Sequence, residues 1–109
     1  MAAGLYLAGA KPIVVIQCTG LFESGDSLRN VIHDYQMPLF AIVGYRSYLS
    51  QETLPGDTAL KFTEPLLKAW ELDYRLIERP DQKHLLRDHC LACRTAGTAG
   101  VALIAEGRA

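Results

Sequence analysis

Cys90 and Cys93 are the most conspicuous candidates for metal or redox chemistry in this chain, because they form a Cys-x-x-Cys pair directly after His89. Leu86, Cys90 and Cys93, however, have the spacing of one helix face, where a buried cysteine packs as a small hydrophobic side chain. A structural zinc site would need two more ligands, and the sequence has no second Cys-x-x-Cys and no His-x-x-x-His. We therefore predict that both cysteines pack in the core, and we assign no metal ligand.

Polar side chains follow two apolar runs, at residues 13–16 and 39–43. Gln17-Cys18-Thr19-Gly20 comes directly after the first run, and Arg46 comes shortly after the second. Because open α/β sheets bind ligands at the carboxyl ends of their strands, we expect binding residues here. The guanidinium of Arg46 suits a carboxylate, phosphonate or sulfonate at that position, and a solvated loop arginine is the alternative interpretation.

The remaining histidines and glycines form no recognisable catalytic motif. His33 and His84 are solitary, and we expect both at the surface, with His33 near the end of a predicted helix where a cation suits the helix dipole. No GxGxxG or GxxxxGK[ST] pattern is present, so a phosphate-binding loop is not indicated.

Composition excludes several classes of partner. The net charge is −1, from eleven basic and twelve acidic side chains, and no basic stripe favours nucleic acid. No apolar run approaches the about 20 residues of a membrane-spanning helix, and the N-terminus lacks the basic segment of a signal peptide. Three cysteines are an odd number, so we expect no disulfide framework and predict a cytoplasmic protein.

Strands and helices alternate along the chain. Apolar runs rich in β-branched residues predict strands at residues 13–16, 39–43, 74–77 and 101–105. Helical patterns between them predict an α/β fold, with a mostly parallel sheet, helices on both faces and right-handed crossovers. We expect a single domain over residues 1–109.

The predicted helices differ in how clearly they begin. Residues 2–9 indicate the tail of a helix that Gly9 ends, and the absence of a cap before Ala2 suggests a missing helix start and a missing N-terminal strand. A helix over 23–35 would be capped by Ser24 or Asp26. Residues 48–60 indicate an irregular excursion, after which Thr63 starts a helix, and a further helix covers 81–94.

Four segments of the chain have the form of known motifs. They are Ala2-Ala3-Gly4-Leu5-Tyr6-Leu7-Ala8-Gly9; Lys11-Pro12 with the strand to Gln17-Cys18-Thr19-Gly20-Leu21; Pro38 to Gly44 with Tyr45-Arg46; and Glu64-Pro65-Leu66-Leu67-Lys68-Ala69-Trp70 before Asp73-Tyr74. Together they resemble the alanine/glycine-rich helix, the "KP-strand-QNSGLGN" segment, the "IP-strand-WRG" segment and the "ALLEALGIPY" helix of the pyrimidine-binding (PYR) domain of thiamine-diphosphate enzymes. The decarboxylases of sulfopyruvate and phosphonopyruvate are the most similar.

The resemblance implies an activity and a set of site residues. The chain would be the PYR subunit of a decarboxylase of an anionic 2-oxo acid, with thiamine diphosphate taking up the electron pair that departing carbon dioxide leaves. A PP-domain (beta) subunit would hold the diphosphate through Mg²⁺, in a homo- or hetero-oligomer. The resemblance implies that Thr19, Gly20 and Leu21 contact the cofactor, and that Gln17 and Arg46 contact the substrate.

Two departures from the family pattern limit this prediction. The family's activating glutamate lies before the alanine/glycine-rich helix, so no residue of this chain corresponds to it and no catalytic residue is assigned. Phe22 and Glu23 replace a small glycine and an asparagine. We therefore predict a subunit that is inactive alone. One alternative is a non-catalytic α/β module that oligomerises or binds a partner through exposed Leu5, Tyr6 and Leu7; another is a metal or redox role for the two cysteines.

Overall fold

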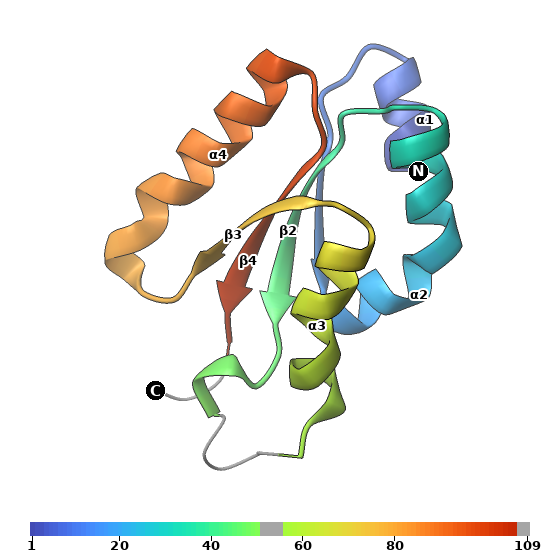
Figure 1. Ribbon diagram of the computed structural model, residues 1–109. Coiled ribbons are helices and arrows are strands. Elements are labelled where there is room, and N and C mark those ends of the chain that lie inside the picture. The colour runs from blue at the N-terminus through green and yellow to red at the C-terminus, as the bar shows by residue number, and fades with distance from the viewer. Residues whose placement is uncertain (51–55, 107–109) are drawn as a thin grey trace.

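The computed structural model describes residues 1–50 and 56–106, in which helices and strands alternate as predicted (Figure 1). The strands are β1 (Ile13–Gln17), β2 (Phe40–Tyr45), β3 (Asp73–Ile77) and β4 (Gly100–Ala105). The α-helices are α1 (Ala2–Leu7), α2 (Cys18–Arg29), α3 (Thr58–Ala69) and α4 (Lys83–Ala96). Three short helical turns are the π-helical Asn30–Asp34 and the 3-10 turns Tyr48–Ser50 and Pro80–Gln82.

The four strands form one sheet in the order β1-β2-β4-β3, and every pairing is parallel. Right-handed crossovers place α2 and α3 on one face of such a sheet. The first two crossovers move across the sheet from β1 toward β3, whereas the crossover from β3 to β4 moves back. A right-handed connection in this opposite sense puts α4 on the opposite face. Figure 1 shows α4 alone on one side and α1, α2 and α3 on the other. The predicted fold class, a parallel sheet with helices on both faces, is confirmed.

Each face of the sheet has its own hydrophobic cluster. Under α2 and α3 the buried members are Cys18, Leu21, Val43, Tyr45, Ala59, Leu67, Leu72, Val101 and Leu103. Under α4 they are Phe40, Ile77, Cys90, Cys93 and Ala102. The central strands β2 and β4 contribute to both clusters, which explains why their sequences are apolar throughout.

Strand β1 is at one edge of the sheet and is covered on one face only. Val14 and Ile16 face α2, whereas Ile13 and Val15 are 46% and 72% exposed. Helix α4 packs on β3 and β4 and leaves this part of the sheet open. A continuous apolar surface therefore remains on the far side of β1.

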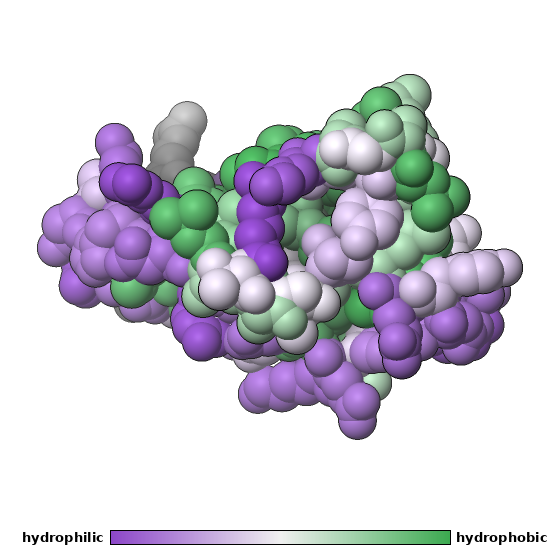
Figure 2. Space-filling model, turned by 90° about the horizontal axis from the view of Figure 1, so that it is seen from above, coloured by the Kyte–Doolittle hydropathy of each residue, from purple (hydrophilic) through white to green (hydrophobic). Residues whose placement is uncertain are grey.

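Helix α1 ends as predicted, with Gly9 in the left-handed region at φ +93°. Its Leu5 and Leu7 are 45% and 73% exposed. Figure 2 shows hydrophobic surface gathered toward the α1 side of the molecule, while the side occupied by α4 is mainly hydrophilic. Among the described residues, no helix combines the length and the apolar character that crossing a membrane requires.

Helix α2 begins earlier than predicted. Its first residue is Cys18, directly after β1, instead of Glu23, and neither Ser24 nor Asp26 caps this start, which follows Gln17. The helix is kinked at Gly25, whose backbone is non-helical at φ 20° and ψ −104°, close to the predicted start. The Ser24 hydroxyl donates to the carbonyl oxygens of Gly20 and Leu21 within the helix. The early start has a physical cause: Cys18 and Leu21, three residues apart, are 0% and 2% exposed, and a helix points both into the core.

Helix α3 also begins earlier than predicted, at Thr58 instead of Thr63. Asp57 caps it, since its carboxylate accepts a hydrogen bond of 3.0 Å from the backbone N–H of Ala59. Thr63 is inside the helix, fully buried, and its hydroxyl donates to the Ala59 carbonyl. Pro65 follows within the same helix instead of near its start. The predicted excursion over 48–60 is therefore helical from Thr58 on, and its residues 51–55 lie outside the described residues.

Candidate functional site

The carboxyl end of β1 leads directly into the first turn of α2. Gln17 is the N-cap, with extended backbone at φ −87° and ψ 164°. The backbone N–H groups of the next residues have no intrahelical acceptor, which makes this end of the helix suitable for polar ligands. The hydroxyl of Thr19 is exposed and donates to Gln17 Oε1 at 3.4 Å. The structure thus brings together two of the predicted site residues, Gln17 and Thr19.

Glu106 joins this pair and was given no role in the sequence analysis. Gln17 Nε2 donates to Glu106 Oε2 at 3.0 Å. The backbone of Glu106 is fixed on both sides, because its N–H donates to the Tyr45 carbonyl at 3.2 Å and its carbonyl accepts from Leu49 at 2.9 Å. The carboxylate lies over Gly44, where an added Cβ would be only 2.1 Å from Glu106 Oε1. A glycine on the neighbouring strand therefore makes room for this acid. We call Gln17, Thr19 and Glu106 the polar edge group.

The other predicted site residues lie apart from one another. Leu21 is 2% exposed in the core cluster under α2, so its side chain faces the protein interior. Gly20 lies in the first turn of α2 against Ile16, with an added Cβ 3.4 Å from the Ile16 Cβ. Arg46 is exposed and its Nε is 3.5 Å from Asp57 Oδ2. The predicted anion-binding arginine thus binds a carboxylate of this chain.

Asp57 connects Arg46 to the start of α3. The Ser47 hydroxyl donates to Asp57 Oδ2 at 2.5 Å. This hydrogen bond, the one from the Ala59 N–H and the charge of Arg46 together lower the pKa of the Asp57 carboxyl, with burial opposing them. The Arg46 side chain is 53% exposed, and because ion pairs open to water contribute only about 0–1 kcal/mol, this pair holds the guanidinium weakly.

Tyrosines and glutamates form a second network beside this edge. Glu64 accepts hydrogen bonds from Tyr45 at 3.0 Å and from Tyr74 at 2.9 Å, and Tyr48 donates to Glu78. Burial and then Glu64 raise the pKa of Tyr45, and the hydrogen bond to Glu78 raises the pKa of Tyr48 to about 12. These phenols therefore stay protonated, and the network supports β2 and α3 instead of supplying a base.

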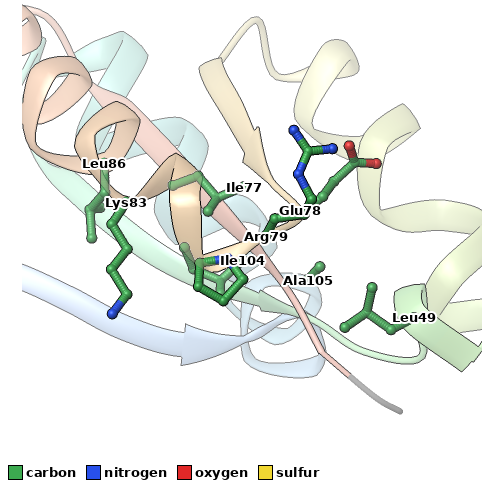
Figure 3. Close-up of a pocket in the computed structure, with 9 residues that line it drawn as sticks. Leu49, Ile77, Glu78, Arg79, Lys83, Leu86, Ile104 and Ala105 are labelled. Carbon is green, nitrogen blue, oxygen red and sulfur yellow. The ribbon is translucent and has the colours of Figure 1, made fainter. Parts of the chain in front are cut away.

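An apolar hollow of about 370 Å³ lies at the carboxyl ends of β3 and β4 (Figure 3). Ile77, Leu86 and Ile104 line its wall, and Arg79 and Lys83 lie at its rim. Ala105, which also lines the hollow, directly precedes Glu106. The carboxyl edge of the sheet therefore combines a polar part at β1 and an apolar part at β3 and β4.

The cysteines pack as predicted. Cys90 and Cys93 are 9% and 3% exposed, in the cluster under α4. Burial is the main cause that raises the pKa of the Cys93 thiol. His33 and His84 are exposed, as expected, and His33 Nε2 contacts the Trp70 carbonyl. His89, which the sequence analysis noted only as a neighbour of the cysteines, is the buried histidine and lies against Cys93.

Comparison with known proteins agrees with the motifs. The chain is 26% identical over 86 residues to sulfopyruvate decarboxylase subunit alpha of Methanococcus maripaludis, and 26% identical over 87 residues to the protein of the same name from Methanocaldococcus jannaschii. Each match covers 79% of this chain but only 52% and 51% of the relatives, so the chain spans about half their length. No family model matches the sequence, and no solved structure matches it. The resemblance to sulfopyruvate decarboxylases is confirmed.

Proposed function

We propose that this chain is the PYR-type part of a thiamine-diphosphate-dependent decarboxylase of an anionic 2-oxo acid such as sulfopyruvate, and that a PP-domain partner is required for activity. The observation that carries the proposal is the polar edge group. Gln17 and Thr19 belong to the segment that resembles the family motif, and they lie at the carboxyl end of a parallel strand beside an acid. The names of the two relatives agree with this reaction.

The polar edge group fits the aminopyrimidine half of the cofactor. An aminopyrimidine carries ring nitrogens that accept hydrogen bonds and an amino group that donates them. Gln17 offers both an amide donor and an acceptor, Thr19 a hydroxyl, and Glu106 a carboxylate. When bound, the cofactor supplies a ring that takes up the electron pair left by carbon dioxide. That electron-accepting ring is the thiazolium; this chain's residues would hold and orient the other ring, the aminopyrimidine, with Glu106 as the carboxylate that faces it.

The diphosphate half does not fit this chain alone. Arg46 is the cation closest in sequence to the end of β2, and a single guanidinium does not balance the charges of a diphosphate. A partner that holds the diphosphate through Mg²⁺ would explain this distribution, and the chain would be inactive without it. Arg46 would then exchange Asp57 for the anionic tail of the substrate.

Exposed apolar surface supports an assembly. Ile13, Val15, Leu5 and Leu7 are all at least 45% exposed, and surface of this kind is normally covered by a partner. The same surface favours the second candidate function, a non-catalytic module that binds a partner through it. Three free cysteines fit a reducing compartment, and we propose the cytoplasm.

The experiment that tests the function is reconstitution. The chain is mixed with a PP-domain subunit, thiamine diphosphate and Mg²⁺, and release of carbon dioxide from sulfopyruvate, phosphonopyruvate and pyruvate is measured. We expect decarboxylation of an anionic substrate that requires both chains. Gln17→Ala should lower kcat/KM about tenfold or more, because a hydrogen bond to a charged group contributes about 1.5–3 kcal/mol.

A control variant and the partner-binding readout separate the outcomes. Arg87→Ala, an exposed change on α4, should leave the rate unchanged. Sedimentation of the mixture shows whether the two chains associate. Association without decarboxylation would replace the enzymatic proposal by the non-catalytic module, and decarboxylation that Gln17→Ala leaves intact would refute the assignment of the polar edge group.

A further inference from the structure

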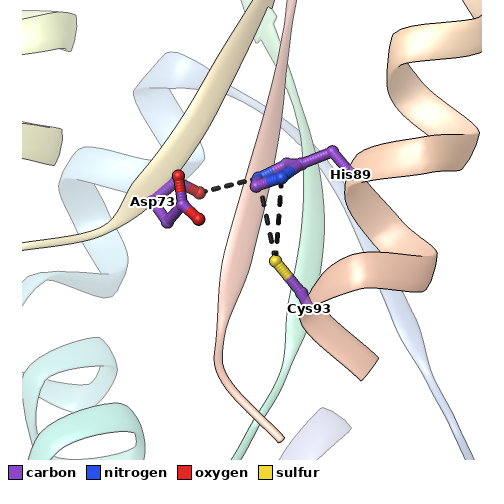
Figure 4. A group of neighbouring side chains, drawn as sticks. All are labelled: Asp73, His89 and Cys93. Atoms are coloured by element: carbon purple, nitrogen blue, oxygen red, sulfur yellow. Dashed lines mark hydrogen bonds between the residues drawn. The ribbon is translucent and has the colours of Figure 1, made fainter. Parts of the chain in front are cut away.

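Asp73, His89 and Cys93 form a cluster of metal-ligating side chains at the other end of the sheet (Figure 4). Asp73 is the first residue of β3, and His89 and Cys93 belong to α4. One carboxylate oxygen, one ring nitrogen and the sulfur all lie within 4.8 Å of one another. His89 and Cys93 are 5% and 3% exposed, so two of the three ligands are shielded from water.

The backbone brings these three residues together for simple reasons. His89 and Cys93 are four residues apart, so they lie on one face of α4, one turn from each other. Asp73 pairs with Gly100 in the parallel register of β3 and β4, and α4 packs on both strands. A Cβ added at Gly100 would be 2.4 Å from Cys93 Sγ and 3.1 Å from His89 Nε2. The glycine thus leaves the space that the two side chains occupy.

The histidine ring is oriented for metal binding through one nitrogen. His89 Nε2 is 2.9 Å from the Asp73 carbonyl oxygen, which favours the tautomer that donates from Nε2 and leaves the Nδ1 lone pair free. Cys93 Sγ is 3.8 Å from Nδ1 and also 3.8 Å from Nε2, and Nδ1 is the nitrogen that the Asp73 carbonyl leaves free. In a tetrahedral zinc site, ligand distances of about 2.0 and 2.3 Å to the ion separate nitrogen and sulfur by about 3.5 Å. The Phe40 ring, 5.6 Å away, packs against His89 from the side of the sheet.

Asp73 supplies the entrance to the cluster. One of its oxygens, Oδ1, is bound by Arg75 at 2.6 Å, and the second oxygen remains for an ion. The residue is exposed and lies at the border of a hollow of about 470 Å³ that Thr98 also lines. Asp73 is the member of the cluster that lines this hollow, so an ion would approach the buried sulfur and nitrogen past its carboxylate, and water can complete its coordination.

We propose that Asp73, His89 and Cys93 bind a divalent transition metal ion, with zinc as the best match. One sulfur, one nitrogen and one oxygen suit zinc, whereas magnesium and calcium prefer oxygen alone. Three protein ligands leave the fourth tetrahedral position for water. Binding releases the thiol proton of Cys93 to solvent, and no oxidation is involved. This set differs from the Cys90–Cys93 pair that the sequence suggested, because Cys90 is not a ligand. The proposal stands independently of the decarboxylase proposal, since the cluster is at the amino ends of β3 and β4.

Cobalt substitution tests the proposal on the intact, reduced chain of residues 1–109. Co²⁺ is titrated into the chain, and absorption is followed for a thiolate-to-cobalt charge-transfer band and for the intense visible bands of tetrahedral cobalt. We expect one equivalent to bind, and zinc to displace it. Cys93→Ser should abolish the charge-transfer band, whereas Cys90→Ser should retain it.

Asp73 is the exposed ligand of the three, so a substitution there does not disturb core packing. Asp73→Asn should weaken cobalt binding about tenfold or more, and Asp81→Asn is its matched control, because Asp81 is also an exposed acid paired with an arginine. Circular dichroism establishes that each variant is folded. The proposal is overturned if the folded wild-type protein shows no thiolate band, if Cys90→Ser instead of Cys93→Ser removes it, or if Asp73→Asn and Asp81→Asn bind equally well.

Discussion

Gly44 and Gly100 offer a matched pair of substitutions that measures how rigid each end of the sheet is. Both are buried glycines in adjacent parallel strands, and each has a side chain in the space that a Cβ would fill. At Gly44 the obstacle is the carboxylate of Glu106, 2.1 Å from the added Cβ. At Gly100 it is Cys93 Sγ at 2.4 Å, with Phe40 a further neighbour at 3.3 Å. The same added methyl group therefore meets the tip of a partly buried side chain in one case and a packed core in the other.

The expected free energies of unfolding differ accordingly. Glu106 is only partly buried, so in Gly44→Ala its carboxylate can swing away. That change loses the hydrogen bond from Gln17, which is exposed, and gains about 0.5–1 kcal/mol because alanine has less backbone entropy to lose. The net cost should be within about 1 kcal/mol of zero. Cys93 is 3% exposed and held on α4, so Gly100→Ala overpacks the core and should cost about 1–3 kcal/mol.

Urea unfolding followed by circular dichroism measures both values on the same chain. If the free energy of unfolding of both variants falls with urea concentration at the same slope but reaches zero at different urea concentrations, the substitutions have changed the packing of the native state and not the denatured state. We expect Gly100→Ala to lower the melting temperature by several degrees, since about 1 kcal/mol corresponds to about 4–8 °C in a domain of this size. If Gly44→Ala is as destabilising as Gly100→Ala, then Glu106 is fixed as firmly as the core, and the reasoning from its exposure is refuted.

Two further predictions concern the ionisable groups beside the carboxyl edge. The pKa of Tyr48 is raised to about 12 in the folded chain from about 10 in the unfolded one, so its contribution to stability is complete below about pH 10 and is lost as the pH rises toward 12. In Tyr48→Phe, the free energy of unfolding measured across alkaline pH should lose this part of its pH dependence. Identical pH dependence in the variant and the wild type would contradict the assignment. The pKa of Asp57 is lowered in the folded state, so Asp57 stabilises the fold fully above its ordinary pKa of about 4, and this stabilisation is lost as the pH falls below that value. Asp57→Ala should therefore lower the thermal midpoint at pH 7 more than at pH 3. Arg46→Ala should shift the midpoint little at pH 7.

The sequence was sufficient for the strands and the fold class because the information there is local. Runs such as residues 13–16 are apolar and β-branched, and their spacing leaves room for one helix between each pair. The first residues of the helices were less predictable, because the most prominent capping and proline motifs lie inside the helices and not at their starts. Pro65 is typical of a first helical turn but lies inside α3, and the true cap is Asp57. The spacing of Ala59, Thr63 and Leu67, each four residues apart and buried, was the signal that would have extended the helix.

The candidate sites could be predicted only in part, because they depend on strand order. Gln17 ends β1 and Thr19 follows two residues later, so their proximity was predictable. Glu106 lies beside them only because β4 is next to β2, and nothing local to residue 106 indicates that neighbour. His89 and Cys93 share a helix face that the sequence shows, whereas Asp73 joins them through the pairing of β3 with β4.

Both candidate sites therefore depend on the position of one strand. Strand β4 begins at Gly100, beside the Asp73–His89–Cys93 cluster, and is followed at its other end by Glu106 in the polar edge group. Its register pairs Gly100 with Asp73 on one side and with Phe40 on the other. A shift of one residue would turn Glu106 to the opposite face of the sheet and place a Cβ against Cys93. Because any other residue at position 100 would overlap the sulfur, the tight packing there helps to fix the register that brings Glu106 to Gln17.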